Sequence, residues 1–161
     1  NQSVEASLEK WKQEGIFTLW QTGKFYAEKC SEIAGKYSDS VIATPFIDRM
    51  DLAYRAADLV VSRAGAGTIS ELQLLSKPAV LVPSPNVAED HQRRNAEALA
   101  TRGAAVMVLD ADAPSKLQDT VVSLITDPGR LCKTGEAAGK MALPKADEKI
   151  VDIIDNILAK K

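Results

Sequence analysis

Short apolar runs alternate with amphipathic, helix-like patterns along the whole chain. The runs predict strands at residues 16–21, 40–44, 58–62, 79–82 and 104–109. The amphipathic patterns predict helices at residues 2–14, 25–36, 48–56, 68–76, 90–102, 115–126, 129–141 and 147–159. Apolar strands of about five residues that alternate with helices are typical of a buried parallel sheet with crossover helices. We therefore expect an α/β fold, a Rossmann-like parallel sheet of about five strands flanked by helices.

The length and the first residues bear on domain organisation. The 161 residues fit one domain, spanning residues 1–161, and contain no repeat, linker or low-complexity stretch. The chain opens on Asn1, and its first predicted element is a helix with Val4, Leu8 and Trp11 on one side. Because domains of alternating strands and helices commonly open on a strand, we expect this chain to be a fragment, with a strand and a loop preceding it.

Composition and charge exclude several classes of protein. A formal net charge of −2 gives the whole chain no electrostatic attraction to nucleic acid. No run approaches the ~18–20 apolar residues of a membrane span, and no signal peptide opens the chain. Cys30 and Cys132 have neither Cys nor His near them in sequence, so they fit neither a zinc site nor a disulfide framework, and a reducing cytoplasm is the simplest setting.

The loops that follow the predicted strands are where a ligand is expected. In open parallel sheets, ligands bind beyond the carboxyl ends of the strands. This rule directs attention to the loops at residues 21–24, 45–50, 63–68 and 83–90.

The most informative loop is the glycine-rich segment between the third predicted strand and its helix. Gly65, Ala66 and Gly67 would let a ligand approach the backbone closely, and the following helix start presents unpaired N–H groups with a partial positive charge. A diphosphate would suit this place, with the Thr68 hydroxyl as an added donor. The segment matches neither the Walker loop nor the dinucleotide fingerprint. A plain tight turn from strand to helix is the alternative.

Glu71 has two possible roles. Thr68 and Glu71 have the spacing of a capping box, in which the Glu side chain bonds back to the N–H of the cap residue. Alternatively, the carboxylate accepts hydrogen bonds from ribose hydroxyls. The local pattern alone favours the cap.

Two further groups of residues could contact a ligand. His91, the only histidine, and Gln92 fall in the first turn of a helix that Asp90 is expected to cap, where they could bond sugar hydroxyls; a surface role is the alternative. A catalytic triad is not expected, because no Ser or Cys nucleophile is placed beside His91. Phe46, Ile47 and Met50 form an apolar set that either packs on the core or makes a slot for a flat base.

Residues 46–50, 57–71 and 89–96, with Pro83 and the Gln-Thr-Gly at 21–23, closely resemble the C-terminal domain of the MurG family. These are bacterial transferases that move N-acetylglucosamine from UDP-GlcNAc to lipid I, forming lipid II in peptidoglycan synthesis. The match extends in order over roughly residues 16–110. It implies the donor-binding half of a two-domain, inverting glycosyltransferase of the GT-B fold that needs neither a metal nor another cofactor.

The resemblance also implies a role for each matching residue. Uracil would lie among Phe46, Ile47 and Met50, and the diphosphate would lie against Gly65, Ala66, Gly67 and Thr68. Glu71 would bind the ribose rather than act only as a cap. Gln92 and His91 would contact the GlcNAc hydroxyls, and Asn95 would orient the loop. The catalytic residues, the contact with lipid I and the peripheral attachment to the cytoplasmic face of the inner membrane would belong to the half of the protein that this chain lacks.

One departure and several alternatives remain. The glycine-rich Gly-Gly-Ser loop that opens this domain in the family is absent from the sequence. The alternatives are a donor-binding subunit of the two-chain dolichol-pathway type, a glycolipid synthase, a UDP-sugar epimerase of the same fold, and a nucleotide-binding module without catalysis.

Overall fold

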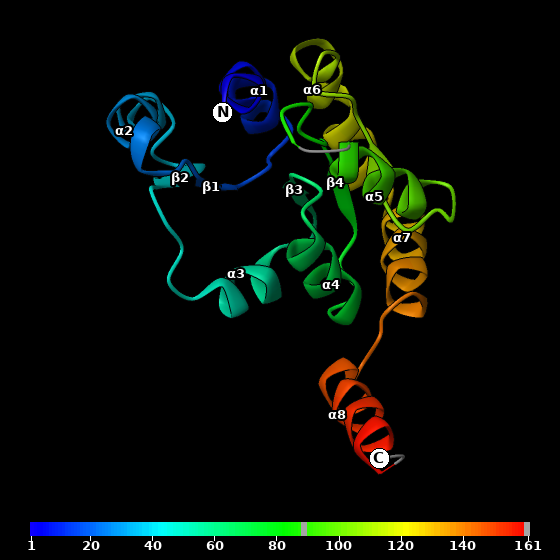
Figure 1. Cartoon of the computed structure of the whole chain (residues 1–161). Coiled ribbons are helices and arrows are strands. Elements are labelled where there is room, and N and C mark those ends of the chain that lie inside the picture. Colours follow the sequence, from blue (N-terminus) through cyan, green and yellow to red (C-terminus); the bar gives the residue numbers. More distant parts are fainter. Residues whose placement is uncertain (88–89, 160–161) are drawn as a thin grey trace.

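The computed structural model describes residues 1–87 and 90–159. Glu89, the first residue of the run at 89–96, lies outside these ranges. The elements are α1 (Gln2–Gln13), β1 (Thr18–Gln21), the 3-10 turn η1 (Lys24–Tyr26), α2 (Ala27–Gly35), β2 (Val41–Thr44), α3 (Met50–Ala56), β3 (Val60–Ser62), α4 (Ala66–Leu74), β4 (Ala79–Leu81), α5 (His91–Ala100), β5 (Val106–Met107), α6 (Ala113–Ile125), α7 (Pro128–Lys140) and α8 (Ala146–Leu158) (Figure 1). Every predicted helix and strand is present within a few residues of its predicted ends.

The strands are parallel, as predicted, but they form two ladders. β1 pairs with β2, and β3, β4 and β5 pair in that order. The expected single sheet is thus divided: in the described part of the chain, no backbone ladder joins β1 to β3. The parallel strands with flanking helices confirm the α/β fold class.

Two hydrophobic clusters hold the elements together, and β4 contributes to both. Val80 and Val82 face one cluster and Leu81 faces the other, because alternate side chains of a strand point to opposite faces. The first cluster joins α1, α2 and α6 to the strands and includes Leu8, Trp11, Trp20, Leu117 and Leu124. The second cluster joins α4, α5 and α7 and includes Ile69, Leu72, Leu99 and Ala138. Buried on both faces, β4 is the central strand of its sheet.

Close backbone packing joins α4 to α7. Gly135 of α7 lies so near the turn after α4 that an added Cβ would be 2.5 Å from the Ser76 carbonyl oxygen. The start of α7 is defined by Pro128 in its first turn and by Asp127, whose Oδ1 accepts a 2.9 Å hydrogen bond from the Arg130 N–H. This packing holds α7 against the C-terminal end of α4.

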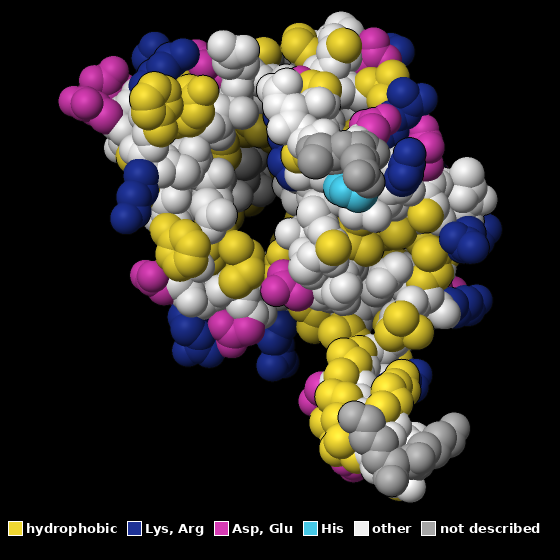
Figure 2. All heavy atoms as spheres, in the orientation of Figure 1, with side chains coloured by type: hydrophobic (Ala, Val, Ile, Leu, Met, Phe, Trp, Pro, Cys, Tyr) yellow, Lys and Arg dark blue, Asp and Glu magenta, His cyan; other side chains and the backbone are white. Residues whose placement is uncertain are grey.

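The last helix, α8, projects away from the two clusters (Figure 1). Its aliphatic side chains gather on an exposed surface (Figure 2). Those at least half exposed include Ile150, Val151, Ile153, Ile154, Ile157 and Leu158. Among the described residues, no helix has the length and apolar character needed to cross a membrane.

Candidate functional site

The loop between β3 and α4 differs from its predicted form. α4 begins at Ala66 with Gly65 as its N-cap, so the capping-box interpretation of Thr68 and Glu71 is wrong: the helix starts two residues before Thr68. The N-cap residue makes no side-chain hydrogen bond to this helix start. The first backbone hydrogen bond of the helix runs from the Ile69 N–H to the Gly65 carbonyl, at 3.0 Å. The N–H groups of Ala66, Gly67 and Thr68 are therefore open to an anion, as at other helix starts that bind phosphate.

The glycines of this loop leave room beside the backbone. An added Cβ at Gly65 or Gly67 would meet no heavy atom within 4 Å, and neither residue has a positive φ. Neither packing nor backbone conformation thus requires glycine there. Close approach of a ligand, the reason expected from the sequence, stays a prediction for both glycines.

Arg63, to which sequence reasoning gave no role, holds this loop to the neighbouring strands. Its Nη1 donates to the Val82 carbonyl at 3.1 Å and to the Pro83 carbonyl at 3.4 Å, and it pairs with Asp110. These contacts join the segments after β3, β4 and β5. Asp110 is 47 residues away in sequence, so no local pattern could have revealed the pair.

Glu71 has a partner that the sequence did not predict. The Tyr54 hydroxyl on α3 donates to Glu71 Oε2 on α4 at 3.1 Å. Burial, followed by the hydrogen bond and the charge of Glu71, raises the pKa of Tyr54 to about 12. Tyr54 therefore stays a protonated donor near neutral pH. The Glu71 side chain is otherwise exposed, and its role toward ribose stays a prediction.

The expected base slot lies on the loop after β2. Phe46 is 62% exposed, whereas Ile47 and Met50 are half-buried. The Ile47 N–H donates to Gln21 Oε1 at 2.9 Å, and the Thr44 hydroxyl donates to the Phe46 carbonyl at 2.8 Å. The Ile47 N–H thus already has a partner, and a base would either displace the Gln21 side chain or use the Ile47 carbonyl.

The first turns of α5 contact the loops that follow β3 and β4. Gln92 Oε1 accepts a 2.9 Å hydrogen bond from the Ser84 N–H, and Asn95 Nδ2 donates to the Ala64 carbonyl at 3.2 Å. Asn95 thus contacts the loop after β3, and its loop-orienting role stays a prediction. Asp90 occupies the expected cap position, although its side chain makes no cap hydrogen bond, and His91 beside it is exposed.

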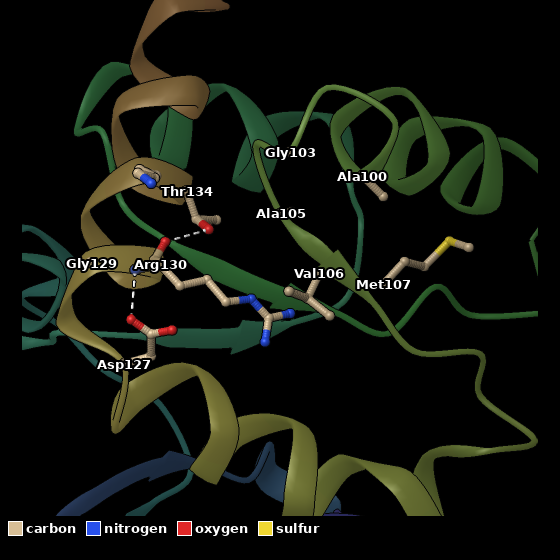
Figure 3. A pocket seen from close by; sticks show the side chains of 10 residues that line it. Ala100, Gly103, Ala105, Val106, Met107, Asp127, Gly129, Arg130 and Thr134 are labelled. Carbon is tan, nitrogen blue, oxygen red and sulfur yellow. Dashed lines mark hydrogen bonds between the residues drawn. The ribbon is translucent and has the colours of Figure 1, made fainter.

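A pocket of about 650 Å³ lies elsewhere, between the end of α5, β5 and the first half of α7 (Figure 3). None of the predicted site residues lines it. Arg130 reaches across it toward Val106 (Figure 3). Within residues 1–87 and 90–159, no group of His, Cys, Asp and Glu side chains is arranged to hold a metal ion.

The chain is similar in sequence to known glycosyltransferases. The family model of the glycosyltransferase family 28 C-terminal domain matches residues 1–155. The UDP-N-acetylglucosamine--N-acetylmuramyl-(pentapeptide) pyrophosphoryl-undecaprenol N-acetylglucosamine transferase of Porphyromonas gingivalis is 50% identical over 98% of this chain and 42% of its own length. The protein of the same name from Parabacteroides distasonis is 46% identical over 100% of the chain and 44% of its own length. The chain thus spans less than half the length of these relatives.

Solved structures show the same architecture. Acinetobacter baumannii MurG superimposes with a TM-score of 0.77 at 27% identity, over 96% of this chain and 49% of that one. The glycosyltransferase VinC in complex with dTDP superimposes with a TM-score of 0.65 at 27% identity, over 80% of this chain and 32% of that one.

Proposed function

Because this chain belongs to the family of the glycosyltransferase family 28 C-terminal domain, we propose that it is the donor-binding part of a transferase that uses UDP-N-acetylglucosamine. The relatives that are 46–50% identical to it are named as N-acetylglucosamine transferases. In the proposed reaction, N-acetylglucosamine passes from UDP to the lipid-linked N-acetylmuramyl-pentapeptide acceptor that those names describe.

The start of α4 is the observation that carries this proposal. Three backbone N–H groups, those of Ala66, Gly67 and Thr68, point out of an uncapped helix end beside glycines with free space around them. The helix dipole adds a partial positive charge at the same place. Such an arrangement suits a diphosphate, which carries negative charge and acceptor oxygens.

We propose the other contacts of the donor from the positions of the loops. The base would lie near Phe46, Ile47 and Met50, and the Glu71 carboxylate would accept from ribose hydroxyls. The Ser84 N–H holds Gln92 by its Oε1, so the Gln92 Nε2 group is left to donate to a sugar hydroxyl. His91, in the same first turn, would contact the sugar as well.

The chemistry proposed for this chain is stabilisation of the leaving group. An acceptor hydroxyl attacks the anomeric carbon from the face opposite UDP, the bond from that carbon to the diphosphate oxygen breaks, and the configuration inverts. Negative charge grows on the leaving diphosphate, where the N–H groups of α4 would meet it without a metal ion. The acceptor proton would pass to a base outside this chain, and we propose that lipid I and the cytoplasmic membrane surface are also engaged there.

Calorimetric titration of the chain with UDP-GlcNAc tests this proposal. UDP-glucose, UDP-GalNAc and ADP-glucose serve as competing ligands, and circular dichroism verifies that each protein is folded. We expect saturable binding that prefers UDP-GlcNAc and weakens at least about tenfold in Glu71→Ala, since a hydrogen bond to a charged group contributes about 1.5–3 kcal/mol. Glu32→Ala, which removes an exposed helical carboxylate on α2, should bind like the wild type.

Two outcomes would overturn the proposal. A folded chain that shows no saturable binding of UDP-GlcNAc has no donor site. Equal affinity for ADP-glucose would contradict the uracil slot and the assignment of the donor.

A further inference from the structure

One side-chain hydrogen bond joins the two helices that border the proposed donor site. Tyr54 Oη on α3 donates to Glu71 Oε2 on α4, with 3.1 Å between the oxygens. The bond therefore connects the element that carries the base slot to the element that faces the diphosphate.

The position of the pair matches the order of groups in a nucleoside diphosphate. Tyr54 lies one helical turn after Met50 of the base slot, and Glu71 lies one turn after Gly67 at the diphosphate end of α4. Residues four apart share one face of a helix. Each residue of the pair is thus one turn from a residue proposed to contact the base or the diphosphate, and the hydrogen bond brings the two together. In a nucleoside diphosphate the ribose joins those two groups.

The Tyr54 hydroxyl is held in place by packing of its ring. Tyr54 is half-buried and packs against the cluster that contains Ile69 and Leu72, both buried residues of α4. Because the ring is packed against the cluster and a tyrosine hydroxyl is protonated near neutral pH, the donor does not need to be ordered when a ligand arrives.

Glu71 gains the most from such a partner. Its side chain is exposed, and its Oε1 accepts no hydrogen bond within the described residues. An exposed glutamate loses side-chain conformational entropy when a ligand fixes it. A hydrogen bond to Oε2 restricts the carboxylate beforehand and leaves Oε1, with the second lone pair of Oε2, free to accept.

We propose that Tyr54 is a positioning residue that orients the Glu71 carboxylate toward the ribose hydroxyls of the donor and so makes the site selective for ribonucleotides. The inference rests on the donor site proposed above. It assigns to Tyr54 no contact with the nucleotide: Tyr54 acts only through Glu71.

Calorimetry with two nucleotides separates positioning from a general structural effect. The ligands are UDP and 2′,3′-dideoxy-UDP, which lacks both ribose hydroxyls; the proteins are the wild type, Tyr54→Phe, Glu71→Ala and the double variant. We expect Tyr54→Phe to weaken UDP binding about fivefold, as one hydrogen bond is worth about 1 kcal/mol, and to leave dideoxy-UDP binding unchanged. In the Glu71→Ala background, Tyr54→Phe should have no further effect on UDP.

The control is Tyr37→Phe. Tyr37 is also half-buried and packs on a core cluster, but its hydroxyl makes no hydrogen bond within the described residues, so this variant should bind both nucleotides like the wild type.

Failure of this inference is distinguishable from failure of the donor site. If the wild type prefers UDP to the dideoxy analogue but Tyr54→Phe keeps that preference, the positioning role is overturned and the donor site stands. Equal weakening of both nucleotides by Tyr54→Phe, or additive effects in the double variant, would assign Tyr54 a structural role only. If the folded wild type binds neither nucleotide, the donor site itself is refuted, and the inference with it.

Discussion

Replacing Gly67 by alanine should affect stability and ligand binding in opposite directions. Gly67 is the second residue of α4, its φ is not positive, and an added Cβ would meet no protein atom within 4 Å. The substitution causes neither strain nor a clash in the free protein, and alanine restricts the unfolded chain more than glycine does. At a compatible site this raises the free energy of unfolding by about 0.4–1 kcal/mol, and we expect the lower end in a first helical turn.

Binding should become weaker because the same methyl group occupies the space proposed for the diphosphate. An extra methyl group in a filled contact costs about 1–3 kcal/mol. The dissociation constant for UDP-GlcNAc should therefore rise roughly 5- to 150-fold. Calorimetric titration measures the change in affinity, and urea unfolding followed by circular dichroism measures the change in stability.

Gly35→Ala is the matched control. Gly35 ends α2, has no positive φ, and also has no atom within 4 Å of an added Cβ. This variant should gain similar stability and bind UDP-GlcNAc like the wild type. If Gly67→Ala also binds like the wild type, the space beside this loop is not where the donor lies, and the reasoning from the open helix start is refuted.

Three further predictions concern stability. Gly135→Ala should lower the free energy of unfolding by about 1–3 kcal/mol in urea titrations, because the added Cβ would be 2.5 Å from the Ser76 carbonyl oxygen. An unchanged free energy of unfolding would mean that α7 can move away from Ser76 at no cost. Because the pKa of Tyr54 is raised to about 12 in the folded protein, its contribution to stability should be complete below about pH 10 and lost as the pH rises toward about 12. Tyr54→Phe should therefore flatten the fall in the free energy of unfolding over that range, measured at successive pH values. An unaltered slope would contradict the raised pKa of Tyr54. Ile153 on α8 is 59% exposed, so Ile153→Ala should change the free energy of unfolding by no more than about 0.5 kcal/mol. Leu124 is 0% exposed, so Leu124→Ala should lower it by about 2–5 kcal/mol. Equal losses of stability in thermal melts would show that α8 is packed against the protein in solution.

The sequence predicted which loops form the candidate site but not the contacts within them. The rule that ligands bind at the carboxyl ends of parallel strands selected the loop with Gly65 and Gly67, and the structure places an open helix start there. The capping-box interpretation of Glu71 failed because the spacing of Thr68 and Glu71 does not by itself fix where the helix begins. Only the backbone shows that α4 begins at Ala66.

The amino-acid sequence by itself determined the order and type of the elements. Alternation of apolar and polar positions is a local property, so each strand and helix could be recognised in its own segment. The tertiary structure decided which distant side chains meet: the Tyr54 hydroxyl with Glu71, 17 residues apart, and Gln21 with the Ile47 N–H, 26 residues apart. It also divided the strands into two ladders, because hydrogen bonding between strands depends on how packed helices place them side by side. Such contacts depend on angles and distances between whole elements, which no local pattern encodes.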